Sequence, residues 1–258
     1  MALPFALIDA FASAPFTGNP AAVCWLEEQK DEEWMKLTAA ELNAPETAFL
    51  EKVEDGYRLR WFTPAAESER CGHATLAAAH FAYEQGLVED GVEVRFHTRF
   101  GLLTATKRED GIRLDLPAEP AERADAPEEL IQALGLIPRF TSRNRMGYLI
   151  EVDSEATVRT LKPDFMLLCR LSAQAVIRGR EHDFVSRVFM PASGPDEDFV
   201  SVFAHCALAP YWQRRLRKDE LLPYQASRRG GELRLHLEQG RVFMTGRATT
   251  IVTGHFRA

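Results

Sequence analysis

The pattern Arg-x-Phe-x-Pro occurs twice in the chain, at residues 60–64 and again 127 residues later at 187–191. A second pair of matching positions follows: Glu67 and Cys71 in the first half correspond to Glu197 and Ser201, 130 residues later. Each copy leads from an apolar, strand-like segment into an Ala-rich, helix-like one. Since half of the 258 residues is 129, the two matches predict a duplicated unit in which a strand turns into a helix.

The segment 117–127 is the best candidate for a linker between the two units, because it holds three prolines and little that could pack in a core. We therefore expect domains at 1–117 and 118–258, with the last strand able to return to the first domain. The two strand-to-helix turns are expected to face one cleft, since small-molecule sites prefer domain interfaces. Strands are expected at 5–11, 47–53, 57–63, 92–98, 102–107, 112–116 and 184–190, and helices at 31–42, 74–85 and 204–217.

Charge and composition exclude several classes of partner. A formal net charge of −7 disfavours nucleic acid and anionic membranes, because it repels phosphate. The sequence has no apolar run near the ~20 residues that span a bilayer, and its first residues lack the pattern of a secretory signal. The four cysteines are too scattered to predict a disulfide scaffold or a metal site. We expect a cytoplasmic protein that binds a small molecule.

Two segments could carry chemistry. Gly72 and His73 stand where a helix is expected to begin, and the first amides of a helix can hold a carboxylate. His73 could donate to such a ligand or relay a proton, although a plain helix cap is the alternative. Glu46 precedes the apolar residues 48–50, and a carboxyl in such surroundings tends to have a raised pKa that suits general acid/base catalysis. An exposed loop glutamate is the alternative for that residue.

Longer motifs resemble the phenazine-biosynthesis isomerase-like family over nearly the whole chain. In the first half these are DAF at 9–11, FxGNPAAV at 16–23, NxxETAF at 43–49 and RWFTPxxExxxCGHAT at 60–75; in the second half they are DFVSRxFxP at 183–191, ED at 197–198, AHCALAPYW at 204–212 and RGG at 229–231. The resemblance implies an α/β (α+β) chain with the diaminopimelate-epimerase-like fold. Each of two pseudo-equivalent domains would be a curled mixed or antiparallel, barrel-like sheet around a central helix. It also implies isomerisation by a proton shift without a cofactor or metal, and a homodimer.

The same resemblance assigns roles to individual residues. Glu46 matches the family's catalytic glutamate, and His73 and Asp198 match its partners. The residues that it assigns to substrate binding are Gly18, Asn19, Cys71, Gly72, Ala74 and Ser201.

The second half departs from the family pattern Glu-Asp-Pro-x-Thr-Gly-Ser-Ala-His, since residues 197–205 read Glu-Asp-Phe-Val-Ser-Val-Phe-Ala-His. A β-branched Val202 is expected to resist a glycine turn, and Phe203 to fill the place of a small hydroxyl residue, leaving a smaller or more apolar pocket.

A two-thiol racemase is disfavoured, because the repeat partner of Cys71 is Ser201, a far weaker acid. Two hypotheses remain. One is an isomerase of a small unsaturated carboxylic acid with Glu46 as general acid/base in the interdomain cleft. The other is an inactive relative that binds a small acid or a protein partner.

Overall fold

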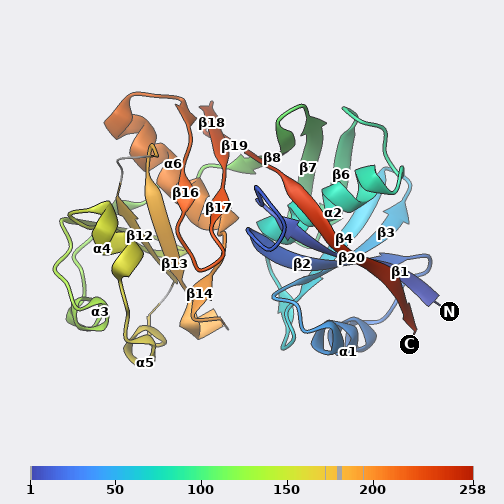
Figure 1. The fold of residues 1–258 in the computed structure, drawn as a ribbon, viewed down its shortest axis with the longest axis horizontal. Coiled ribbons are helices and arrows are strands. Elements are labelled where there is room, and N and C mark those ends of the chain that lie inside the picture. The colour runs from blue at the N-terminus through green and yellow to red at the C-terminus, as the bar shows by residue number, and fades with distance from the viewer. Residues whose placement is uncertain (1, 172, 179–181, 194, 258) are drawn as a thin grey trace. The chain divides into compact units, whose positions relative to one another are not determined.

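The computed structural model describes residues 2–171, 173–178, 182–193 and 195–257 (Figure 1). The chain divides into two compact units. Unit 1 comprises Met1–Asp115 together with Met244–Ala258, and unit 2 comprises Leu116–Phe243. None of the helices in the described part of the chain has the length and apolar character that a membrane-spanning helix needs.

Unit 1 is built on a curled sheet whose strands follow the order β8-β7-β6-β4-β3-β2-β1-β20. The strands are β1 (Ala2–Ala10), β2 (Asn19–Leu26), β3 (Thr47–Val53), β4 (Gly56–Phe62), β6 (Glu93–Thr98), β7 (Gly101–Arg108), β8 (Gly111–Pro117) and β20 (Ala248–Arg257). A two-residue strand, β5 (Glu67–Ser68), pairs with β4 beside this order. The pairs β2–β3 and β4–β6 are parallel, whereas β1–β2, β1–β20, β3–β4, β6–β7 and β7–β8 are antiparallel.

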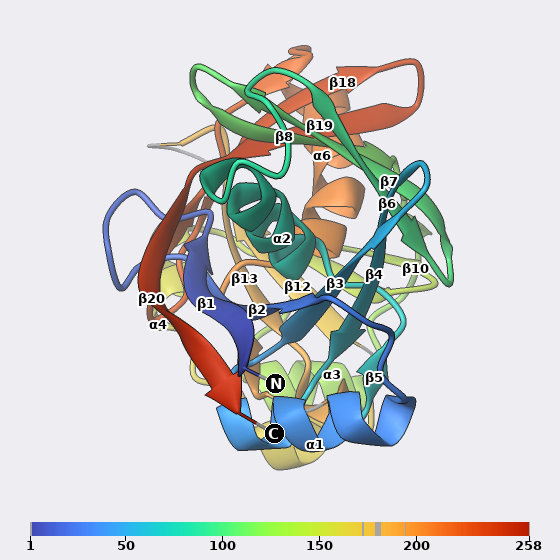
Figure 2. The same ribbon diagram turned by 90° about the vertical axis from the view of Figure 1, so that its right-hand side faces the viewer.

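Helix α2 (Gly72–Glu84) runs inside the curl, where Figure 2 shows strands of unit 1 around it. Its side chains are buried on nearly every side, as expected for a helix without a polar face. Five of them are alanines, which allow the surrounding strands to approach closely: Ala74, Ala77, Ala78, Ala79 and Ala82. Helix α1 (Glu32–Leu42) packs Met35 and Ala39 on a separate cluster with strands β1 to β4.

Unit 2 has its own sheet, in the order β17-β16-β13-β12-β11-β10-β9. Its strands are β9 (Glu122–Arg123), β10 (Phe140–Asn144), β11 (Gly147–Glu151), β12 (Ala173–Arg178), β13 (Val185–Phe189), β16 (Tyr224–Gln225) and β17 (Gly231–Glu232), with β14 (Glu197–Asp198) paired to β13. Strands β15 (Glu220–Leu221), β18 (Arg234–Glu238) and β19 (Arg241–Gly246) pair in the order β15-β18-β19. The helices are α3 (Glu128–Leu134), α4 (Glu155–Thr160), α5 (Phe165–Leu168), the short 3₁₀ helix η1 (Pro191–Ser193) and α6 (Val202–Leu216).

The pairing pattern is the same in the two units. The series β1-β2-β3-β4-β6 in unit 1 and β10-β11-β12-β13-β16 in unit 2 both alternate antiparallel and parallel pairs in the same order. In each unit the fourth strand also pairs with a two-residue strand, β5 or β14, that leads into the long helix. The mixed α/β fold with curled sheets is therefore as predicted, and the topology agrees with the repeat in the sequence.

Candidate active site

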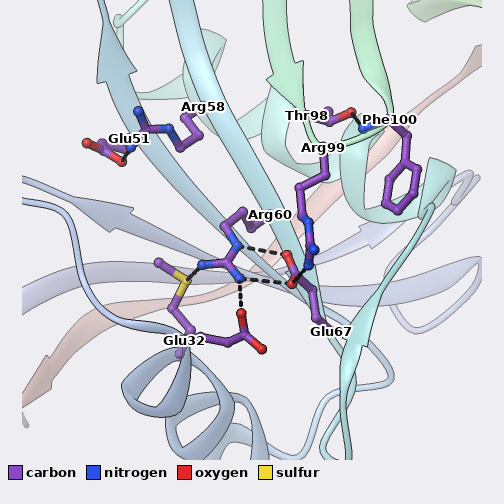
Figure 3. A network of polar contacts seen from close by, with 9 residues as sticks. Glu32, Glu51, Arg58, Arg60, Glu67, Thr98, Arg99 and Phe100 are labelled. Atoms are coloured by element: carbon purple, nitrogen blue, oxygen red, sulfur yellow. Dashed lines mark hydrogen bonds and ion pairs between the residues drawn. The ribbon is translucent and has the colours of Figure 1, made fainter.

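A charged network fixes the strand-to-helix segment of unit 1. Arg60 donates through Nε and Nη2 to the two carboxylate oxygens of Glu67, at 2.7 and 2.8 Å, and through Nη2 to Glu32 at 2.9 Å (Figure 3). Arg99 also donates to Glu67, at 2.6 Å. The hydrogen bond from Arg60, with a further one from Arg99, lowers the pKa of Glu67. This carboxylate consequently stays ionised and ties β5 to β4.

Beside Glu67, β5 carries a residue that contacts the predicted general base. The hydroxyl of Ser68 donates to Glu46, with Oγ 2.9 Å from Oε1 and 3.0 Å from Oε2. Glu46 is half-buried just before β3, and its carbonyl accepts a hydrogen bond from the amide of Ala22 at 2.9 Å. Sequence reasoning missed Ser68, although it is the repeat partner of Asp198.

His73 is the second residue of α2, and its side chain lies in the core of unit 1. A ring N–H donates to the backbone carbonyl of Pro20, but burial has the larger effect and lowers the pKa of His73 to about 3. The imidazole is therefore neutral near pH 7. A neutral ring can donate from one nitrogen and accept at the other.

Strand β2 anchors both Glu46 and His73. The carbonyl of Pro20 holds the ring of His73, and the amide of Ala22 holds the backbone of Glu46. Two residues along a strand span about 7 Å. Glu46 and His73 are thus attached to one short segment of a single strand, although they lie 27 residues apart in sequence.

The turn before β2 holds the next two predicted site residues. Gly18 has φ +69°, and a Cβ at this position would lie 2.2 Å from the carbonyl oxygen of Ala10, so only glycine fits. Asn19 begins β2 and is buried. The buried carboxylate of Asp9, the first residue of the DAF motif, accepts a hydrogen bond from the amide of Phe16 at 2.8 Å and closes this loop.

The remaining predicted residues of unit 1 lie at the start of α2. Cys71 is the buried N-cap residue, with its Sγ 3.4 Å from Nδ1 of His73. Its side chain makes no capping hydrogen bond to the helix, whereas its carbonyl accepts from the hydroxyl of Thr75 at 2.5 Å. Gly72 and Ala74 are both buried in the first turn. This turn brings a thiol and a neutral imidazole together beside helix N-terminal amides.

Asp198 and Ser201 belong to unit 2, where one buried side chain connects them. Gln225 donates through Nε2 to the carbonyl of Asp198 at 2.6 Å and accepts at Oε1 from the amide of Ser201 at 2.8 Å. Ser227 donates to the carbonyl of Phe199 at 2.7 Å. These bonds fix the backbone of 198–201 on β16 and the turn that follows it. No signal in the sequence indicated Gln225.

The structure corrects one expectation about this segment. Val202 is the first residue of α6, as Gly72 is the first residue of α2, and both are helical. The N-cap residues before them, Ser201 and Cys71, are both extended, with ψ of 105° and 106°. The expectation that a β-branched residue conflicts with a glycine-only turn is wrong, because helical φ and ψ are open to valine. Phe203 is half-buried at the repeat position of His73, and its effect on a ligand pocket stays a prediction.

Within the described residues, no group of three or more His, Cys, Asp or Glu side chains could hold a metal ion.

Comparison with known proteins gives consistent results. The family model "Phenazine biosynthesis-like protein" (PhzC-PhzF) matches residues 8–254. An uncharacterized isomerase of Halalkalibacterium halodurans is 47% identical over 258 residues, covering 98% of this chain and 97% of that protein. A phenazine biosynthesis-like domain-containing protein of Homo sapiens is 35% identical, and the alignment covers 100% of both chains.

Solved structures show the same similarity. The crystal structure of a phenazine biosynthesis protein of the PhzF family from Enterococcus faecalis has a TM-score of 0.96 and 37% identity, with 100% of both chains covered. A hydroxyproline epimerase from Agrobacterium vitis has a TM-score of 0.68 at 13% identity, covering 98% of this chain and 92% of that one. The likeness to the epimerase is one of fold alone.

Proposed function

The chain belongs to the phenazine biosynthesis-like (PhzC-PhzF) family, and from this premise we propose that it is an isomerase that moves a proton between two carbons of a small unsaturated carboxylic acid without a cofactor. Relatives that match it over nearly their whole length are named isomerases, which supports this class of enzyme. The family predicted from the sequence motifs is thereby confirmed. The expected homodimer and cytoplasmic location stay predictions, which sedimentation and cell fractionation would test.

The observation that carries the proposal is the carboxylate of Glu46, held at both oxygens by Ser68. A hydrogen bond to a carboxylate favours its ionised form, which is the form that accepts a proton. The backbone of Glu46 is fixed on β2, so the carboxylate starts from a defined position. Such positioning is what general base catalysis requires.

In the proposed reaction, Glu46 removes a proton from a carbon beside the double bond. The electron pair of the broken C–H bond spreads over the unsaturated acid, and the double bond shifts. Glu46 then returns the proton to a different carbon, directly or through His73, which is neutral and can both donate and accept. The proton and the electrons are conserved, so the step needs no oxidant or reductant.

The substrate carboxylate would bind at the first turn of α2, from Gly72 to Ala74, because helix N-terminal amides favour an anion and stabilise developing negative charge. Gly18 and Asn19 would border the same ligand at the start of β2. Asp198 belongs to unit 2, and the catalytic role that the family motif assigns to it stays a prediction.

Solvent deuterium incorporation tests the proposal. In D₂O, the wild-type protein is expected to exchange carbon-bound protons of 2,5-cyclohexadiene-1-carboxylate, a small unsaturated acid with an acidic C–H bond. Glu46→Gln keeps the shape of the side chain but cannot take the proton, so exchange should fall by ~10²-fold or more. Glu41→Gln, an exposed substitution on α1, is the matched control. Equal exchange in the wild type and in Glu46→Gln would contradict the role of Glu46.

The inactive relative remains the second candidate, because Val202 and Phe203 replace the glycine and the small hydroxyl residue of the family pattern. Binding without proton exchange, across a panel of cyclic and acyclic unsaturated acids, would favour it.

A further inference from the structure

We propose that Ser68 is a positioning residue for Glu46: its hydroxyl orients the carboxylate and holds it ionised, ready to abstract a proton. The inference rests on the proposed function, and it concerns a side chain to which neither the family motif nor the sequence repeat assigned a role.

The geometry of the contact suits an ionised partner. The Oγ of Ser68 lies 2.9 and 3.0 Å from the two oxygens of Glu46, almost equally far from each. A serine hydroxyl has a single proton to donate, and an ionised carboxylate offers two equivalent acceptor oxygens. A hydroxyl placed between them restricts rotation of the carboxylate plane and favours the charged form.

The scaffold around Ser68 explains why its hydroxyl can be placed so accurately. Strand β5 pairs with β4, where Ser68 lies opposite Trp61 and Glu67 opposite Phe62. Successive side chains of a strand point to opposite sides. Glu67 therefore meets Arg60 and Arg99 on one side, as Figure 3 shows, while Ser68 meets Glu46 on the other. The arginine network anchors the strand, and the strand presents the hydroxyl.

The repeat gives this position additional weight. In unit 2 the partner of Ser68 is Asp198, which lies opposite Val188 on β13 as Ser68 lies opposite Trp61 on β4. The same strand position is therefore occupied in unit 1 by Ser68, whose hydroxyl holds Glu46, and in unit 2 by Asp198, which the family motif assigns to catalysis.

A titration without any ligand tests the contact. The ¹³C signal of the Glu46 carboxyl, assigned by its absence in Glu46→Gln, would be followed against pH in four proteins. Ser68→Ala should raise the pKa of Glu46 by about one pH unit, because a donor to the ionised form is lost. Ser68→Thr keeps a hydroxyl and should behave as the wild type. Thr250→Val is the matched control, since Thr250 also donates to a carboxylate of unit 1, that of Glu84, at 2.6 Å.

A kinetic experiment tests the role in the reaction. The acid limb of the pH profile for deuterium exchange into 2,5-cyclohexadiene-1-carboxylate should move to higher pH in Ser68→Ala by about the same one pH unit. Ser68→Thr should restore the wild-type profile. Thermal unfolding of each variant shows whether a change comes from loss of the fold.

The two proposals fail in different ways. An unchanged Glu46 titration and an unchanged pH profile in Ser68→Ala would overturn the role of Ser68, while loss of exchange in Glu46→Gln would leave the proposed function standing. Exchange that survives Glu46→Gln would overturn the proposed function, and the titration would still show whether Ser68 holds the carboxylate.

Discussion

The strand-to-helix segments of the two units share their scaffold and differ in their polar residues. In unit 2, Arg187 donates to the two oxygens of Glu197 at 2.7 and 2.9 Å, as Arg60 does to Glu67 in unit 1 at 2.7 and 2.8 Å. Each guanidinium also lies over the phenylalanine two residues further along its strand, at 4.8 Å in unit 2 and 5.1 Å in unit 1. The Arg–Glu ion pair and the Arg–Phe contact that fix the strand-to-helix turn are thus present in both units.

The helix starts show what has changed. The N-cap carbonyl accepts a side-chain hydrogen bond from the residue four positions later in both units, from Thr75 in α2 and from His205 in α6. At two of the three positions between, however, Gly72 and His73 in unit 1 correspond to Val202 and Phe203 in unit 2. Thr75 and His205 thus make the same hydrogen bond to the N-cap carbonyl in their two units. Gly72 and His73, which suit binding of an anion and transfer of a proton, occur in unit 1 alone of these two helix starts.

The largest effect is expected from breaking the shared ion pairs. Arg187→Ala should lower the free energy of unfolding by about 2–3 kcal/mol, because it leaves the half-buried Glu197 without its bidentate partner. Arg60→Ala should cost less, since Glu67 keeps Arg99. Urea unfolding measures both, with Arg58→Ala as the control for a more exposed pair expected to contribute about 0.5 kcal/mol. Equal losses in the two variants would show that Arg99 does not compensate.

A smaller effect is expected from the two buried histidines, His73 and His205, which should make the free energy of unfolding depend on pH. Burial lowers the pKa of His73 to about 3 and that of His205 to about 4, below the ordinary value of 6.5. The unfolded chain therefore takes up protons first, and the stability that each neutral ring contributes is complete above pH 6.5 and is lost as the pH falls towards the folded pKa. Each histidine should add a slope of up to about 1.4 kcal/mol per pH unit in this range.

Urea unfolding between pH 7.5 and 5 measures this slope. His73→Gln and His205→Gln should each reduce this slope relative to the wild type. Burial also lowers the pKa of His80, so some slope should remain in the double variant. A slope as steep in the double variant as in the wild type would show that His73 and His205 do not contribute to it.

The smallest effect concerns the altered helix start. Val202→Gly with Phe203→Ser restores the family residues at the first turn of α6 and should permit weak sulfate binding there, visible as amide shifts of residues 202–204 in NMR titrations. Glycine in the helix should cost about 1 kcal/mol of stability. Val202→Ala with Phe203→Ala is the matched control. If sulfate shifts neither protein, these two side chains are not what distinguishes the two units.

The sequence was most informative about local structure. The strand expected at 47–53 agrees with β3, and the helix expected at 204–217 corresponds to α6, which starts two residues earlier at Val202. Apolar periodicity and turn residues are local signals, so they predict such elements well. The pattern Arg-x-Phe-x-Pro at 60–64 and 187–191 predicted the repeated topology. Three different residue types at the same spacing in both halves are hard to explain without a duplicated structure.

The contacts of the candidate site could not be predicted in the same way. Ser68 meets Glu46 across 22 residues and Gln225 meets Asp198 across 27, and both contacts depend on how short strands pair. No residue pattern marks such a pairing in a single sequence. The roles expected of Glu46, His73 and Asp198 rest on the family motif, and the structure adds the bonds that hold each residue in its own unit.

The pairing of β20 with β1 has a consequence for how the chain is made. Strand β1 is synthesised before unit 2, but the partner that covers its outer edge, residues 248–257, follows the whole of unit 2. At about 5–20 residues per second, the roughly 130 residues of unit 2 delay that partner by some 6 to 26 s. During this interval β1 presents an open edge of the kind that invites pairing with other chains. Translation speed and chaperone access should therefore influence the yield of folded protein through this one strand.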